Sequence, residues 1–164
     1  MENEISSRKC LKCSLCGKHG NTTNMVLEKT TITDRRGKDI QLQKNLNCSS
    51  YGVYAAECRL CQRLYVGQTI NKFSIRWNSH RNSWKNLCLG KEKLKEDSDN
   101  GALFKHYKRH HQDADLKTLQ LADAYGVMFI EQPTKRNLDI RESYWIAKLN
   151  ASINIAKTIL PKIW

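Results

Sequence analysis

The sequence predicts an α+β fold, because strand-like and helix-like patterns follow each other within one short stretch. Residues 51–56 alternate between two faces and 64–66 resume the strand pattern, so the two segments are expected to form a hairpin. After Gly67 the apolar residues recur at helical spacing, and a second helical pattern runs from Leu138 to Leu149. The length of 164 residues suits one domain with an appendage.

The hairpin is expected to bring two tyrosines and two thiols close together. Tyr54 alternates with Val53 in the first strand, and Tyr65 lies at the start of the return strand. Cys58 and Cys61 form a Cys-x-x-Cys pair between the strands, which places both thiols at the hairpin tip.

The helix expected after Gly67 has two sides. Phe73, Trp77 and Trp84 recur at helical spacing, whereas Arg76 and His80, four residues apart, share a different side. We expect the first side to pack and the second to meet a ligand. With the two tyrosines of the hairpin, a guanidinium and an imidazole suit a phosphodiester, since Arg stabilises charge on phosphate oxygens and Tyr or His can move the proton of an attacking water.

The helix expected at 138–149 carries a carboxylate near its packed side. Its apolar stripe consists of Leu138, Trp145, Ile146 and Leu149. Glu142 lies three residues before Trp145 on nearly the same face, and Asn137 or Asp139 would cap the helix. A Glu directed at a packed side is costly unless it is paired or binds a cation, and Mg²⁺ is the cation that carboxylate and phosphate oxygens favour.

These motifs, taken together and in this order, resemble the GIY-YIG nuclease superfamily. The resemblance covers about 51–154 and has six matching elements, which are Gly52-Val53-Tyr54, Tyr65-Val66-Gly67, Arg76, His80, Glu142 and Asn154. The cysteine pair between the tripeptides, the histidines of LFKHYKRHH, the stretch NLNCSS and the upstream Cys-x-x-Cys most resemble the endonuclease domain of Penelope-like retroelements. The resemblance implies a small three-stranded antiparallel sheet flanked by helices, with the apolar segment 127–132 as its third strand.

The resemblance also implies a role for each matching residue of the first hairpin and helix. Tyr54 and Tyr65 would position or deprotonate the attacking water, and Arg76 and His80 would contact the scissile phosphate. The spacing from Tyr65 to Arg76 is about one residue longer than in some members, which a loop tolerates.

Two further roles fall on the C-terminal part. Glu142 would bind the single divalent metal ion, Mg²⁺ or Mn²⁺, so that a tyrosine and not a carboxylate serves as base. Asn154 matches the polar residue that closes the family's site, but Asn150 lies four residues earlier and leaves this assignment open.

A structural zinc site is expected at the hairpin tip. In a reducing compartment a Cys-x-x-Cys pair holds zinc more often than it forms a disulfide, and histidines of LFKHYKRHH would complete the site of Cys58 and Cys61. His106 would be the third ligand. His110 is the i+4 partner on an unbroken helix, whereas His111 fits the retroelement pattern better, and we choose His111. Four protein ligands would make the zinc structural and clamp the hairpin to the later helix.

A second, N-terminal zinc site is expected from three further cysteines. Cys10, Cys13 and Cys16 follow one another at Cys-x-x-Cys spacing, and His19 or Cys48 would supply the fourth ligand. We prefer Cys48, because this closure would hold the N-terminal arm on the nuclease-like part. The remaining thiol, Cys88, has no partner pattern and is expected to be a buried apolar residue.

Composition and charge indicate an intracellular protein that binds a polyanion. The formal net charge is +12 and the pI about 9.5, which attracts nucleic acid. Basic residues recur at 35–38, 59–63, 76–85, 105–111 and 135–141. The N-terminus has no apolar core of a signal peptide, no stretch approaches a membrane span, and seven cysteines is an odd number, so reduced thiols and no membrane partner are expected.

The chain is expected to divide into a zinc-binding arm at 8–48 and a nuclease domain at 49–160. In the arm, 25–33 and 38–43 would be strands around a turn in which Gly37 takes a positive φ. The polar stretch 91–101 would be an exposed loop or helix end, and 116–125 fits a helix or a strand equally well.

The leading hypothesis is a divalent-metal-dependent DNA endonuclease that leaves a 3′-hydroxyl, as the resemblance implies. In a Penelope-like retroelement that hydroxyl would prime reverse transcription, with a reverse transcriptase domain and element RNA as partners and the nucleus as location. The alternative is a zinc-stabilised DNA-binding or targeting module with vestigial nuclease chemistry. An RNA-binding zinc protein would explain the charge and the cysteines but not the pattern of Tyr, Arg, Glu and Asn.

Overall fold

The computed structural model describes residues 26–27, 29–90 and 101–154, and all structural statements refer to these ranges. Its elements, in chain order, are β1 (Thr31–Thr33), β2 (Asp39–Gln41), β3 (Gly52–Cys58), β4 (Leu64–Thr69), α2 (Phe73–Cys88), α3 (Ala102–His110), α4 (Leu121–Ala124), β5 (Tyr125–Glu131), the 3₁₀ turn η5 (Lys135–Asn137) and α5 (Leu138–Leu149). Within these ranges, no helix combines the length and the apolar character that a membrane crossing demands. The fold is α+β.

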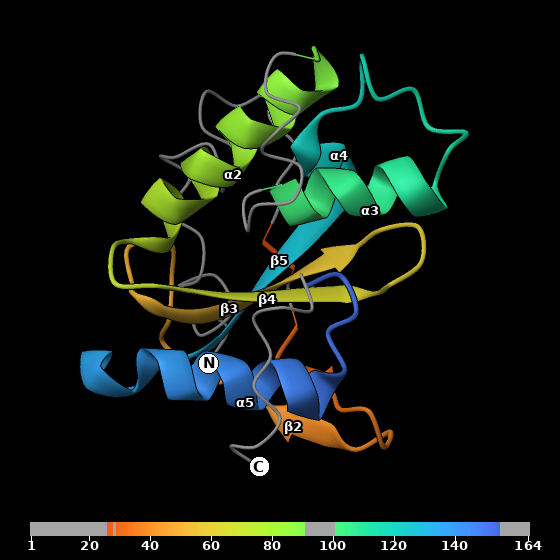
Figure 1. Ribbon diagram of the computed structural model, residues 1–164. Helices are drawn as coiled ribbons and strands as arrows, with labels where there is room; N and C mark the ends of the chain where they lie inside the picture. Colours follow the sequence, from red (N-terminus) through yellow and green to blue (C-terminus); the bar gives the residue numbers. More distant parts are fainter. Residues whose placement is uncertain (1–25, 28, 91–100, 155–164) are drawn as a thin grey trace.

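The main sheet has three antiparallel strands in the order β4-β3-β5, as the resemblance implied (Figure 1). In the β3–β4 hairpin Tyr54 pairs with Gly67 and Ala56 with Tyr65, so the two tripeptides lie side by side. Gly52 begins β3 with φ +144°, and a Cβ there would lie 2.4 Å from the carbonyl oxygen of Glu131. Glycine is therefore the residue that lets β3 approach β5 at this end.

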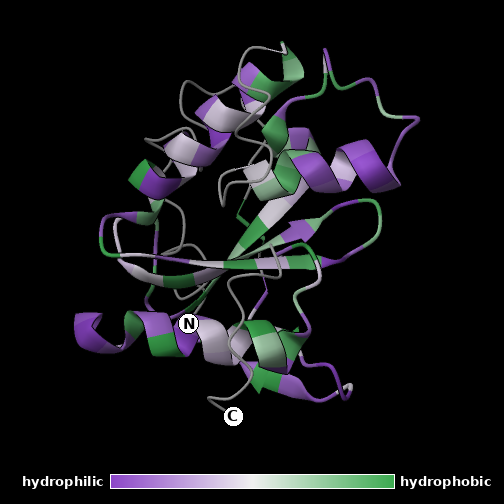
Figure 2. Cartoon of the chain, viewed as in Figure 1, coloured by the Kyte–Doolittle hydropathy of each residue, from purple (hydrophilic) through white to green (hydrophobic). Residues whose placement is uncertain are grey.

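The sheet separates two hydrophobic layers. Alternate residues of β3 point to opposite faces, so that Tyr54 and Ala56 join one core while Val53 and Ala55 join the other. Helices α2, α3 and α4 cover the first face, and α5 with the β1–β2 hairpin covers the second (Figure 1). Hydrophobic colour concentrates on the strands, and the C-terminal half of α3 is hydrophilic (Figure 2).

Helix α2 lies where it was predicted, but the prediction that His80 lies on its open side is wrong. Phe73, Trp77 and Trp84 are buried as predicted. His80 is also buried, with 1% of its surface exposed, so it packs on the same side as the tryptophans and does not share an open side with Arg76. The reason is that positions 73, 77, 80 and 84 follow the three- and four-residue spacing of a single helical face.

Helix α5 agrees with the sequence in its bounds and in its buried stripe. It spans Leu138–Leu149, and Leu138, Trp145, Ile146 and Leu149 are its buried residues. Asn137 occupies the N-cap position, but its side chain makes no capping hydrogen bond. Asn150 ends the helix in the left-handed conformation, at φ 53°, which is a common helix terminus.

The remaining elements refine the predicted boundaries. The third strand begins at Tyr125, two residues before the predicted segment. Of the ambiguous stretch 116–125, residues 121–124 form the short helix α4 and Tyr125 belongs to β5. The arm hairpin is shorter than predicted, with strands of three residues each, and Gly37 has the expected positive φ of 86°. The polar stretch 91–100 lies outside the described residues.

The described residues before β3 pack on the three-stranded sheet and its helices. Ile32 and Leu42 belong to the core beneath α5, and Cys48 belongs to the core beneath α2. The N–H of Leu27 donates to the carbonyl of Val127, at 2.9 Å, which ties residue 27 to the edge of β5. The hairpin β1–β2 therefore contributes to the same two-layered structure.

Candidate functional site

Two strands and a helix bring three predicted residues into one cluster. Tyr54 comes from β3, Tyr65 from β4 and His80 from α2. The hydroxyl of Tyr54 and Nε2 of His80 form a hydrogen bond of 2.6 Å, and the ring centres of Tyr65 and His80 are 5.4 Å apart. We call Tyr54, Tyr65 and His80 the tyrosine–histidine cluster.

Gly67 gives the cluster its space. A Cβ at this position would lie 2.5 Å from the hydroxyl oxygen of Tyr54 and 3.0 Å from Cε1 of Tyr65. Gly67 pairs with Tyr54 across the hairpin, and its missing side chain leaves room for the phenol. The Tyr54 side chain therefore requires glycine at position 67.

The electrostatic environment keeps His80 neutral. Burial is the main cause that holds the pKa of His80 well below its usual value, and the Arg76 guanidinium lowers it further. Nδ1 of His80 is, within the described ranges, the one buried side-chain nitrogen or oxygen without a hydrogen-bond partner. A neutral imidazole that carries its proton on Nδ1 accepts the Tyr54 hydroxyl proton at Nε2, which makes the phenol oxygen more nucleophilic or more basic.

The cluster is closed to solvent in this conformation. Tyr54, Tyr65 and His80 are each exposed by 1% or less, whereas Arg76, one turn before His80, is half-buried. Phe73 and Trp77 pack edge-on against the ring of Tyr54, with centres 5.8 and 6.3 Å away. A phosphate would reach the Tyr54 oxygen only after covering side chains move aside.

Glu142 lies half-buried on α5, in the layer on the other face of the sheet from the tyrosine–histidine cluster. Arg141 and Trp145, on the same helix, bind a different carboxylate, that of Glu131. Glu131, at the end of β5, pairs with the Arg141 guanidinium and accepts a hydrogen bond of 2.9 Å from Nε1 of Trp145. No sequence signal singled out Glu131, because its partners lie ten or more residues away.

Asn154 and Asn150 have different structural roles. The side chain of Asn154 accepts from the N–H of Val66 and donates to its carbonyl, both at 2.8 Å. Asn154 thus anchors the segment after α5 to the outer edge of β4, in the middle of the second tripeptide. Asn150 is the C-cap of α5. Of the two candidates, Asn154 is therefore the one joined to the strand that carries Tyr65.

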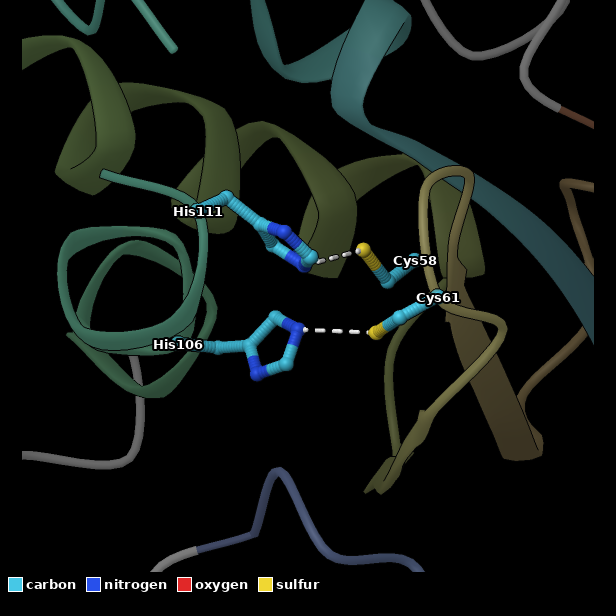
Figure 3. Close-up of side chains that lie close together, drawn as sticks. All are labelled: Cys58, Cys61, His106 and His111. Atoms are coloured by element: carbon cyan, nitrogen blue, oxygen red, sulfur yellow. Dashed lines mark hydrogen bonds between the residues drawn. The ribbon is translucent and has the colours of Figure 1, made fainter. Parts of the chain in front are cut away.

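A second site is the predicted set of two cysteines and two histidines (Figure 3). Cys58, Cys61, His106 and His111 present one ligand atom each, and these atoms all lie within 4.8 Å of one another. Sγ of Cys58 is 3.4 Å from Nε2 of His111, and Sγ of Cys61 is 3.3 Å from Nε2 of His106. In a tetrahedral zinc site, bond lengths of ~2.3 Å to sulfur and ~2.0 Å to nitrogen place these atoms about 3.6 Å apart. The geometry fits a closed structural metal site.

The end of α3 explains why His111 and not His110 joins the site. Helix α3 ends at His110, and His111 follows with φ −131° and ψ 60°, outside the helical region. This change of direction turns its ring toward Cys58, while His110 is exposed. The structure confirms that His111, and not His110, lies with Cys58, Cys61 and His106.

The two histidines of the cluster are neutral at neutral pH, which is the state that binds a metal ion. Burial, with smaller contributions from His111, His110 and Arg63, lowers the pKa of His106 to about 4, so its imidazole is neutral and able to ligate. Burial likewise lowers the pKa of His111. Burial raises the pKa of the Cys61 thiol, and a bound cation would reverse this effect.

The N-terminal zinc prediction falls largely on residues outside the described ranges. These are Cys10, Cys13, Cys16 and His19. Cys48 is described and is buried at the start of α2, where its carbonyl accepts the N–H of Ser74 at 2.9 Å. Cys88 is half-buried, and burial raises the pKa of its thiol to about 11, which makes it an unreactive apolar residue.

Comparisons of the chain with known protein families, with curated proteins and with solved structures found no match. What the structure itself defines is an α+β protein with a small three-stranded antiparallel sheet and a Cys2His2 cluster able to hold a metal ion such as zinc.

Proposed function

We propose that this protein is a divalent-metal-dependent DNA endonuclease of the GIY-YIG type, most like the endonuclease domain of Penelope-like retroelements. One observation carries the proposal. The two tripeptides pair in register, and this pairing brings Tyr54 and Tyr65 together with a neutral His80 that is hydrogen-bonded to the Tyr54 hydroxyl. A phenol polarised by a buried imidazole is suited to activating a water molecule, which is the step that phosphodiester hydrolysis demands.

In this proposal the protein's own groups divide the work. As the attacking water gives its proton to the Tyr54 oxygen, the Tyr54 hydroxyl proton passes to Nε2 of His80. Tyr65 orients the water beside it. Arg76 stabilises the negative charge that spreads over the phosphate oxygens.

The proposal assigns the divalent cation to Glu142. A half-buried carboxylate on α5 offers the oxygen that Mg²⁺ prefers, and phosphate and water would complete the coordination. When bound, Mg²⁺ or Mn²⁺ would neutralise charge on the phosphate. Asn154 would hold β4 and Tyr65 in place through Val66.

Charge supports a nucleic acid as substrate. The net charge is +12, and Arg81, Lys85 and Lys117 line a cavity of about 470 Å³ between α2 and the segment before α4. This cavity lies on the α2 face of the sheet, as the tyrosine–histidine cluster does, so the same DNA backbone could contact both. In the retroelement setting the nicked DNA would present its 3′-hydroxyl to a reverse transcriptase domain and element RNA, in the nucleus.

The second candidate is a zinc-stabilised DNA-binding or targeting module with vestigial nuclease chemistry. The observation in its favour is that Tyr54, Tyr65 and His80 are buried. In this candidate function the three side chains only pack in the hydrophobic core, and the positively charged surface alone contacts DNA.

Plasmid cleavage separates the two candidates. Supercoiled DNA is incubated with Mg²⁺ and either the wild type, Glu142→Ala or Tyr65→Phe, and products are separated on agarose and end-labelled to detect a 3′-hydroxyl. The endonuclease predicts relaxed or linear product from the wild type alone, with DNA affinity of both variants nearly unchanged. Asp139→Ala is the matched control, because it removes an exposed carboxylate of the same helix.

The outcomes assign the roles separately. Intact plasmid with every protein, together with retained DNA binding, would favour the binding module. Equal cleavage by the wild type and Glu142→Ala would refute the metal assignment, even if the protein is a nuclease.

A further inference from the structure

The β1–β2 turn and the C-terminal half of α5 form a positively charged pocket that the proposed nuclease site does not use. The pocket, of about 430 Å³, is lined by Asp34, Arg35, Arg36, Lys38, Tyr144, Ala147 and Lys148. We call it the turn pocket. It lies on the α5 face of the sheet, whereas the tyrosine–histidine cluster lies on the α2 face.

The backbone of the turn is rigidly fixed by Asp34. Its carboxylate accepts the N–H groups of Arg36 and Lys38, both at 2.8 Å, and its carbonyl accepts the N–H of Gly37. Gly37 supplies the positive φ of 86° that the turn needs. These hydrogen bonds, led by that from Lys38, lower the pKa of Asp34, so the carboxylate stays ionised at neutral pH and keeps the turn in place.

The turn is also held on α5. The N–H of Arg35 donates to the carbonyl of Lys148 at 3.0 Å, and Nζ of Lys148 lies 3.8 Å from the Asp34 carboxylate. The Lys148 ammonium lies 5.8 Å from the ring centre of Tyr144, which forms a half-buried aromatic wall of the pocket. The cations therefore surround a fixed concave surface.

The charge of the turn pocket is not balanced within the described ranges. Arg35, Arg36 and Lys38 are exposed and form no side-chain ion pair with described residues, and the carboxylate of Asp34 already accepts two backbone N–H groups. Four cations against one carboxylate leave a strong positive potential over the concave surface.

We infer that the turn pocket binds the phosphodiester backbone of a nucleic acid, as a second contact separate from the tyrosine–histidine cluster. Guanidinium groups match phosphate oxygens, and Arg35 and Arg36 present two of them on the exposed side of the turn. A membrane surface fits less well, because the exposed large apolar residues, such as Ile75 and Ile140, are not among those that line the pocket.

The opposite positions of the two sites have a geometric consequence. The sheet lies between the core that holds the tyrosine–histidine cluster and the core against which Tyr144 of the turn pocket packs. A straight duplex that lies along the cavity beside α2 does not reach the turn pocket, so the turn pocket engages a second nucleic-acid segment or a strand that bends around the protein. This inference does not depend on nuclease activity.

The test is binding of a fluorescent DNA duplex without divalent metal, so that no cleavage can occur, at several salt concentrations. Arg36→Gln/Lys38→Gln is compared with the control pair Arg109→Gln/Arg136→Gln, which removes two exposed cations that line neither the turn pocket nor the cavity beside α2. Two lost phosphate contacts reduce the slope of log K against log[salt] by about 1.8, since each contributes about 0.9. The control pair removes the same net charge and is expected to change the slope by less.

Localisation uses amide NMR of the wild type with the same duplex. We expect shifts at Gly37 and Lys148 that Arg36→Gln/Lys38→Gln abolishes. Equal slopes for the two double variants, or no shift at the turn, would overturn the inference, as would binding of the turn to anionic phosphatidylserine vesicles but not to DNA. Circular dichroism melting first establishes that both double variants are folded.

Discussion

Replacing Gly67 by alanine tests the packing on which the tyrosine–histidine cluster depends. The added Cβ would lie 2.5 Å from the hydroxyl oxygen and 2.6 Å from Cζ of Tyr54. An ordinary contact of this kind is at least 3.4 Å, so the Tyr54 ring must move by about 0.9 Å. Phe73 and Trp77 pack against that ring and restrict the movement.

The sign of the effect on stability is diagnostic. In a strand, alanine is ordinarily more stable than glycine by roughly 0.5–1 kcal/mol, because glycine loses more backbone freedom on folding. Overpacking in a dense core costs about 1–3 kcal/mol. We therefore expect Gly67→Ala to lower the free energy of unfolding by about 1–2 kcal/mol and to lengthen the 2.6 Å hydrogen bond between Tyr54 and His80.

Urea unfolding of the wild type, Gly67→Ala, Tyr54→Phe and the double variant measures this coupling. Removing the hydroxyl removes the shortest contact, so Gly67→Ala should cost less in the Tyr54→Phe background, although the Cζ contact remains. Side-chain NMR of His80 follows the hydrogen bond directly. A Gly67→Ala protein that is as stable as the wild type, with an unchanged His80 signal, would refute the reasoning.

Three other predictions follow from the metal site, the buried histidine and the strand anchor. His111→Ala and Cys58→Ser should each lower the zinc content, measured by mass spectrometry, by one ion per chain, and should lower the melting temperature. His110→Ala should retain the full zinc content. The assigned ligands would be contradicted if His110→Ala lost zinc while His111→Ala retained it. The pKa of His80 in the folded state lies well below 6.5, so as the pH falls from about 7 the unfolded state binds one proton more than the folded state does. The free energy of unfolding should therefore decline by up to about 1.4 kcal/mol per pH unit below 6.5. The wild type minus His80→Gln difference in unfolding free energy isolates this slope, and a flat difference between pH 7 and 5 would contradict a depressed pKa. Asn154→Ala should lower the free energy of unfolding by about 1–3 kcal/mol, because it leaves the N–H and C=O groups of Val66 without partners. Asn150→Gly should be tolerated, because residue 150 has a left-handed backbone conformation. Equal losses of unfolding free energy in the two variants would argue that Asn154 does not anchor β4.

Local pattern determined much of the secondary structure. The stripe of Leu138, Trp145, Ile146 and Leu149 predicted α5 with its bounds, because helical periodicity over three turns has one interpretation. The alternation around Tyr54 and Tyr65 predicted the hairpin for the same reason. Short apolar runs such as 116–125 do not distinguish helix from strand, so α4 and the start of β5 emerged only in the structure.

Side-chain surroundings were harder to infer from spacing. Arg76 and His80 share a side by the i, i+4 rule, yet three-residue spacing equally places His80 beside Trp77, and packing against β3 and β4 decides between them. The same limit hid Glu131, whose partners on α5 are brought to it only by the folding of the chain.

The sequence by itself determined which chemical groups this protein has available: two phenols in paired tripeptides, an imidazole, and two thiols with histidines at the distance along the chain that a zinc site tolerates. Only the tertiary structure decided which histidine faces the thiols, because that depends on where α3 ends, and which Asn reaches β4. It also decided that the turn pocket and the tyrosine–histidine cluster lie on opposite faces of one sheet. The physical reason is that spacing fixes directions within an element, whereas distances between elements follow from how the whole core packs.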